Sequence, residues 1–105
     1  MQILTEGHRY VAANFENPNT GQTIQFIEKI PHPNAVLPGE LVTVNDGTTN
    51  EELCAILIDR MHYLQGKFPC RENAVAITHF ETGLLWLEKR TADRKNRNVE
   101  GKNLK

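Results

Sequence analysis

The chain has 105 residues and a formal net charge of −1, which suits one compact domain and excludes two independent hydrophobic cores. The near-neutral charge excludes a general affinity for polyanions, and no apolar run approaches the roughly 18 residues that span a bilayer. Residues 1–10 lack the basic start and apolar core of a secretory signal, so we expect the protein to stay in the compartment where it is made. Cys54 and Cys70 have no partner at metal-ligand spacing, which predicts a reduced cytosolic setting and no metal site.

The first part of the chain predicts β-structure. Residues 8–15 form one expected strand, residues 16–21 are rich in turn formers, and residues 22–30 alternate as a second strand. Together they predict a β-hairpin with a long loop. Residues 31–40 contain three prolines and a glycine, which predicts a connector, and residues 41–44 predict a third short strand.

The second part predicts two helices. Thr49 and Glu52 form the pattern of a capping box, and Gly66 and Pro69 bound a tight loop after the first helix. The second helix is expected to start within residues 69–72, with proline in its first turn, and to run about 25 residues. The apolar stripes of the two helices are Leu53, Ile56, Leu57, Met61 and Leu64, and then Ala74, Ile77, Phe80, Leu84 and Leu87.

The expected fold class is therefore α+β, a small N-terminal antiparallel β portion followed by a long antiparallel helical hairpin. The β portion covers residues 1–47, the hairpin residues 48–101 and a tail residues 102–105, all within one compact domain. Residues 84–87 are four consecutive apolar side chains and so surround the second helix, which also outruns the first. We expect another copy of the chain to cover this surface, and close helix approach would explain Gly83 in mid-helix.

A candidate anion site lies at the C-terminal end of the second helix. Residues 86–105 carry seven Lys/Arg residues against three acids, a local net charge of +4, while the rest of the chain has a net charge of −5. Arg90 and Arg94 are four residues apart, so both guanidinium groups lie on one helix face and suit a phosphate or pyrophosphate. The same spacing is also consistent with a solvated face that favours a helix C-terminus.

Several stretches of the chain resemble one protein family. Residues 67–74 (Lys-Phe-Pro-Cys-Arg-Glu-Asn-Ala) and 86–94 (Trp-Leu-Glu-Lys-Arg-Thr-Ala-Asp-Arg) are the most specific, and residues 10–31, 48–60 and 99–101 extend the likeness. They resemble the phage Thoeris anti-defence family Tad-one, and the helical hairpin is also similar to that of the anti-CBASS sponge family.

The resemblance implies an immune-evasion protein that acts in the cytoplasm of an infected bacterial host, without a cofactor. Members of the family sequester, without cleaving, cyclic nucleotide signals made by TIR-domain enzymes, chiefly glycocyclic ADP-ribose. They form homo-oligomers, commonly hexamers, and some also hold cyclic di- or trinucleotides at separate sites. A nucleic acid polymer or a membrane is not among the partners that the resemblance implies.

The resemblance also implies ligand-binding residues. They are Tyr63, where the family commonly has Phe, together with Asn73, Arg90 and Arg94, and Arg71 is a further candidate for a phosphate contact. The tail departs from the family at Asn98 and at residues 102–103.

The predicted second helix separates Asn73 from Arg90. Seventeen helical residues between Asn73 and Arg90 correspond to about 25 Å, too far for one small nucleotide. If all of these residues touch one ligand, they must come from two protomers.

Other classes of function remain open from the residues alone. An enzyme is disfavoured because Cys70 and His79, the one pairing with nucleophile chemistry, lie about 13 Å apart along a helix. A nucleic-acid-binding module has only the short basic cluster in its favour. A protein-interaction module or inhibitor could use the apolar helix face instead.

Overall fold

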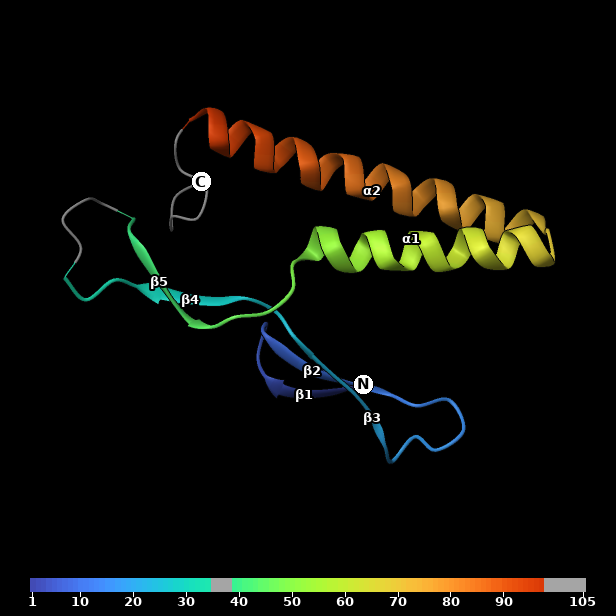
Figure 1. The fold of residues 1–105 in the computed structure, drawn as a ribbon, viewed down its shortest axis with the longest axis horizontal. Coiled ribbons are helices and arrows are strands. Elements are labelled where there is room, and N and C mark those ends of the chain that lie inside the picture. Colours follow the sequence, from blue (N-terminus) through green and yellow to red (C-terminus); the bar gives the residue numbers. More distant parts are fainter. Residues whose placement is uncertain (35–38, 98–105) are drawn as a thin grey trace. The chain divides into compact units, whose positions relative to one another are not determined.

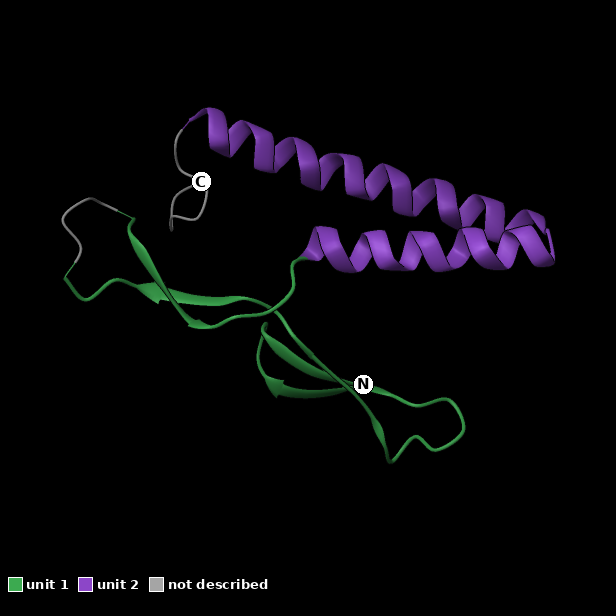
Figure 2. Cartoon of the chain, in the orientation of Figure 1, with its two compact units in different colours: residues 1–49, 101–103 green, residues 50–100, 104–105 purple. Residues whose placement is uncertain are grey.

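The computed structural model describes residues 1–34 and 39–97 (Figure 1). The strands up to Thr49 form one compact unit and the two helices from Asn50 form another (Figure 2). This arrangement confirms the α+β class, with small antiparallel sheets followed by a helical hairpin. The tail positions that depart from the family, Asn98 and residues 102–103, lie outside the described residues.

The first sheet contains a strand that the sequence analysis missed. Strands β1 (Gln2–Thr5), β2 (Arg9–Ala13) and β3 (Gly21–Gln25) pair antiparallel in the order β1-β2-β3. The turn between β1 and β2 includes Gly7 at φ 75°, a left-handed conformation that glycine adopts without strain. All four residues of β1 are exposed, so the strand has no inward-outward alternation that would have predicted it.

The prediction of one continuous strand over residues 22–30 is wrong. The segment divides into β3 and β4 (Glu28–Pro31), and β4 pairs with β5 (Leu41–Asn45) in a second, two-stranded sheet. The break falls at Phe26 and Ile27, where the hydrogen-bond partners of the backbone change. Phe26 N–H donates to the carbonyl of His8, and Ile27 N–H donates to Thr48.

Gly47 allows the segment after β5 to lie against the end of β3. Thr48 N–H donates to the carbonyl oxygen of Gln25 at 2.8 Å. A Cβ atom on Gly47 would overlap the backbone of Gln25 and Phe26. The absence of a side chain is thus a requirement of this contact.

The helical hairpin begins and ends close to the predicted positions. Helix α1 spans Asn50–Lys67 and α2 spans Arg71–Asn96, 18 and 26 residues. The expectation that Pro69 lies in the first turn of α2 is wrong, because Cys70 is the N-cap, in an extended conformation, and its Sγ accepts from the Asn73 N–H at 3.4 Å. The Gln65 side chain closes the turn by donating to the Cys70 carbonyl at 2.9 Å and accepting from its N–H at 3.1 Å.

Polar contacts between described residues connect α1 and α2 along their length. The Thr91 hydroxyl donates to Glu51 at 3.4 Å, the Cys54 thiol donates to the Phe80 carbonyl at 3.5 Å, and His62 lies 3.5 Å from Glu81. The half-buried apolar side chains between the helices include most of the predicted stripes: Leu53, Met61, Leu64, Phe80, Leu84 and Leu87. The structure thus confirms an antiparallel hairpin.

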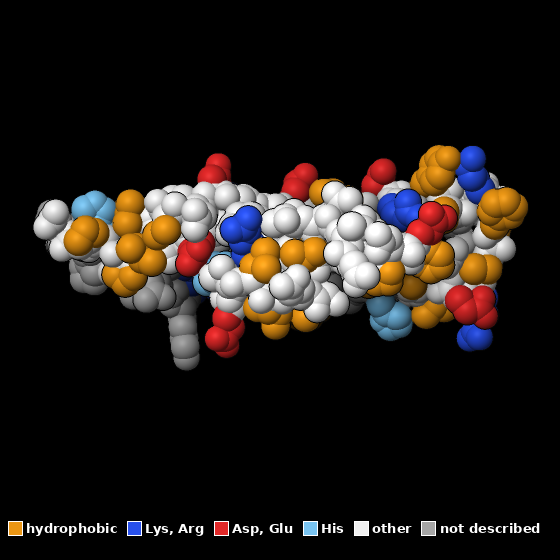
Figure 3. All heavy atoms as spheres, turned by 90° about the horizontal axis from the view of Figure 1, so that it is seen from below, with side chains coloured by type: hydrophobic (Ala, Val, Ile, Leu, Met, Phe, Trp, Pro, Cys, Tyr) orange, Lys and Arg blue, Asp and Glu red, His pale blue; other side chains and the backbone are white. Residues whose placement is uncertain are grey.

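The hairpin leaves much of its apolar surface uncovered. Among the described residues only Ile77 and Arg94 are buried. Ile56 and Leu57, which the stripe of α1 placed in the core, are 57% and 40% exposed, and Leu85 is 65% exposed. Figure 3 shows apolar side chains reaching the surface on the face drawn there. No helix in the described part of the chain is long and apolar enough to cross a membrane.

Replacing Gly47 with alanine is expected to destabilise the strand unit by about 1–3 kcal/mol, because the added methyl group overpacks against the Gln25–Phe26 backbone. Hydrogen exchange of the Ile27 and Thr48 amides, whose bonds cross this contact, should become faster.

The matched control is Gly66→Ala in α1, where a Cβ would meet nothing within 4 Å. This change should stabilise the protein by about 0.5–1 kcal/mol through helix propensity. Unchanged amide exchange in Gly47→Ala would contradict the close approach.

Candidate functional site

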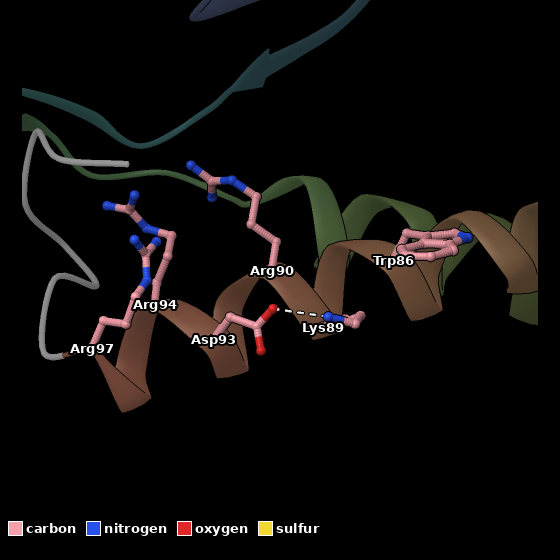
Figure 4. A pocket seen from close by; sticks show the side chains of 6 residues that line it. All are labelled: Trp86, Lys89, Arg90, Asp93, Arg94 and Arg97. Atoms are coloured by element: carbon pink, nitrogen blue, oxygen red, sulfur yellow. Dashed lines mark hydrogen bonds and ion pairs between the residues drawn. The ribbon is translucent and has the colours of Figure 1, made fainter.

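The last turns of α2 carry a hollow of 380 Å³ (Figure 4). Among the residues that the structure describes, the lining comes from α2 and its C-cap Arg97, at spacings of three and four: Trp86, Lys89, Arg90, Asp93, Arg94 and Arg97. Such spacings keep side chains on one helix face. The described part of the lining therefore belongs to one helix face.

The lining of the hollow is strongly cationic. It contains four Lys/Arg side chains and one carboxylate, Asp93. Asp93 accepts from Lys89 Nζ at 3.0 Å, an i,i+4 ion pair whose two side chains are 61% and 56% exposed. Among the described lining residues Asp93 is the one carboxylate, and this ion pair engages it, so the net charge of the described lining is positive.

Arg90, Arg94 and Arg97 extend from the same side of α2, while Asp93 turns toward Lys89 (Figure 4). Arg94 is buried, with 5% of its surface exposed, and Arg90 and Arg97 are exposed. Guanidinium groups present paired N–H donors that match phosphate oxygens. The arrangement suits a small anion with more than one phosphate.

The other predicted site residues lie at the opposite end of α2, around the hairpin turn. Tyr63, in the second-last turn of α1, is 60% exposed, and the Lys67 ammonium lies 5.0 Å from the centre of its ring. Arg71 is the first residue of α2 and is exposed.

Asn73 is half-buried in the first turn of α2. Its backbone N–H donates a hydrogen bond to the Cys70 sulfur. Its side-chain amide makes no hydrogen bond to any of the residues that the structure describes. The cap is thus supplied by the Cys70 sulfur, and the Asn73 carboxamide is available to a ligand.

The structure brings Arg90 and Arg94 together but does not join them to Tyr63 and Asn73 within one chain. Helix α2 is continuous from Arg71 to Asn96, so Asn73 and Arg90 are separated by about 25 Å along its axis. The two groups of candidate residues therefore lie at opposite ends of one helix.

Sequence reasoning missed four residues that line the hollow: Trp86, Lys89, Asp93 and Arg97. The signal was present, because each lies three or four residues from Arg90, Asp93 or Arg94. Trp86 was instead assigned to the apolar surface, since the side chains around it are apolar.

The described geometry does not support a direct thiolate–imidazole pair between Cys70 and His79. His79 lies on α2, nine residues after the N-cap Cys70, which corresponds to about 13 Å of helix rise. The Cys70 sulfur accepts a hydrogen bond from Asn73 N–H. Among residues 1–34 and 39–97, no group of three or more His, Cys, Asp or Glu side chains could hold a metal ion.

Comparison with known proteins connects this geometry to a family. The model of the Acb2/Tad1 hairpin-domain family matches residues 25–92. A curated protein, Thoeris anti-defense 1 from Bacillus phage SBSphiJ7, is 48% identical over 75 residues, which cover 60% of this chain. The matched part spans 53% of that relative's own length.

The charge balance of the hollow can be tested with Asp93→Asn. Removing the one carboxylate of the lining should tighten binding of inorganic pyrophosphate by about 2–5-fold at low salt, and by less at high salt. Calorimetric titration measures this directly. The control is Glu88→Gln, an identical charge change at an exposed position of α2 outside the hollow. An equal effect of both variants would contradict a localised anion site.

Proposed function

The chain belongs to the Acb2/Tad1 hairpin-domain family, and on this basis we propose that it is a phage anti-Thoeris protein. It binds a cyclic ADP-ribose-type immune signal, chiefly glycocyclic ADP-ribose, and sequesters it without cleavage, so that the effector that needs the signal is not activated. The name of the phage relative, Thoeris anti-defense 1, supports the anti-defence role.

The observation that carries the proposal is the cationic hollow on α2. An ADP-ribose-type ligand contains a pyrophosphate, and Arg90 and Arg94 present adjacent guanidinium groups to such an anion. Tyr63 offers an exposed ring for stacking on a base, and the Asn73 carboxamide can both donate to and accept from a ribose hydroxyl or a base edge. Arg71 contributes a further positive charge at the turn.

The length of α2 supports a site that is shared by two chains. Tyr63 and Asn73 of one protomer face Arg90 and Arg94 of another, and the complete site forms at their interface. The exposed apolar side chains of the hairpin support self-assembly, because Ile56, Leu57 and Leu85 have no cover within the part of the chain described. The proposed assembly is a homo-oligomer, a hexamer by likeness to the family.

Binding without catalysis fits the groups present at the two half-sites. Arginine, asparagine and tyrosine side chains can hold phosphate, ribose and base, and the Cys70 sulfur serves as a helix cap. The proposed protein works without a cofactor, in the cytoplasm of the infected bacterial host. Cyclic di- or trinucleotides are further proposed ligands, at separate sites. Ligand recovered unchanged after heat denaturation of the complex is the expected outcome, and a cleaved product would contradict sequestration.

Arg90→Ala should weaken binding of glycocyclic ADP-ribose by roughly 10- to 150-fold, the equivalent of about 1.5–3 kcal/mol for charge-assisted hydrogen bonds. The oligomer should remain intact in analytical ultracentrifugation. The control is Lys95→Ala, which removes an exposed cation from α2 outside the hollow. If Arg90→Ala and Arg94→Ala both retained wild-type affinity, the assignment would be wrong.

Mixing two inactive variants tests whether the site is shared between chains. Asn73→Ala and Arg90→Ala protomers, unfolded and refolded together in equal amounts, should regain about one quarter of the wild-type sites, because only one of four pairings combines two intact halves. At a ligand concentration well below the Kd of either variant, each variant alone should show no binding. A mixture that binds no ligand although it forms mixed oligomers would show that each site lies within one chain.

A further inference from the structure

Trp86 is the one tryptophan of the chain, and it is exposed beside the arginines. Its side chain is 66% exposed, yet it lines the same hollow as Arg90 and Arg94. Tryptophan is enriched at interfaces, where its ring packs against a partner and its indole N–H can donate a hydrogen bond. Figure 4 shows the indole at one end of the row that Arg90, Arg94 and Arg97 continue.

We propose that Trp86 is the base-stacking platform of the anion site, so that the hollow binds the base of a nucleotide as well as its phosphates. The inference rests on the proposed function and adds a specificity-determining residue to it. Arg90 and Arg94 hold the phosphates, and the indole covers one face of the base attached to them.

The spacing along the helix fits a nucleotide. Trp86, Arg90 and Arg94 follow one another at intervals of four residues, which places them about 6 Å apart along the axis and within one face. A nucleotide likewise places its base and its phosphates on opposite sides of a ribose. The row can therefore contact base and pyrophosphate of the same molecule from one helix.

Gly83 keeps the space next to the indole open. It lies three residues before Trp86, and side chains on a helix lean toward the N-terminus, so the indole extends over the turn that contains Gly83. A Cβ atom on Gly83 would meet nothing within 4 Å. Glycine in mid-helix costs about 1 kcal/mol relative to alanine, and no packing within the hairpin requires it. A flat base that rests on the indole would use this open space.

Stacking of a base on Trp86 is also consistent with a site shared by two protomers. A base has two faces, and the indole covers one of them. Tyr63 of a second copy, which the proposed function places opposite the arginines, is available for the other face. Stacking on an aromatic ring adds affinity for every base, so the hollow should prefer nucleotides to inorganic phosphates.

The test uses the fluorescence of the one tryptophan in the full-length protein. ADP and inorganic pyrophosphate carry the same diphosphate, and only ADP carries a base. ADP and glycocyclic ADP-ribose should quench the emission with a midpoint equal to the calorimetric Kd, whereas pyrophosphate should bind without comparable quenching.

Three variants complete the test. Trp86→Ala should weaken ADP binding by roughly 5- to 150-fold and leave pyrophosphate binding unchanged, and Trp86→Phe should restore most of the loss. Gly83→Leu should weaken ADP binding by filling the open space. Lys95→Ala, at an exposed position of α2 outside the hollow, is the control and should leave ADP binding unchanged.

The outcomes separate this inference from the proposed function. Binding of ADP and glycocyclic ADP-ribose without quenching, and with unchanged affinity in Trp86→Ala, would overturn the stacking role and leave sequestration standing. ADP quenching without any binding of glycocyclic ADP-ribose would support the stacking role and remove the proposed signal. Emission that changes on dilution of the protein and not with ligand would overturn the inference, because a sister chain would then cover Trp86.

Discussion

The unbroken length of α2 is the constraint on which the rest of the structure depends. Its 26 residues carry a cationic hollow at one end and the carboxamide of Asn73 at the other. A rigid helix cannot fold back to join its own ends, so a ligand that needs both groups must meet two chains. Affinity for the ligand is then coupled to assembly, because anything that separates the protomers also divides the site.

The sparse packing within the hairpin also supports contact between two chains. Two helices in contact bury one stripe each, and here the packing leaves Ile77 as the one buried apolar side chain among the residues that the structure describes. The apolar side chains that remain on the surface are available for contact with another copy of the chain. In this account the same interface covers the apolar surface and completes the ligand site. The stability of the assembly and the binding of the ligand therefore both depend on that interface.

The sequence predicted the helices well because their signals are local. The apolar stripes and the glycine and proline near residues 66–69 gave both helices to within a few residues. The β portion was predicted less well. Strand β1 is exposed throughout and lacks alternation, and the break between β3 and β4 depends on hydrogen bonds to His8 and Thr48, distant in sequence.

The Cys70 cap was missed because sulfur is a weak acceptor and cysteine is not among the preferred capping residues. Arg90 and Arg94 could be placed together by spacing alone, while Trp86 could not be distinguished from its apolar neighbours until the hollow was visible.

Calorimetric titration of the full chain with glycocyclic ADP-ribose tests the central claim most directly. The account predicts tight, saturable binding at about one ligand per chain, because every protomer of a symmetric assembly supplies one of each half-site. It also predicts that the ligand leaves the protein chemically unchanged. The absence of binding, or the recovery of a cleaved product, would contradict it.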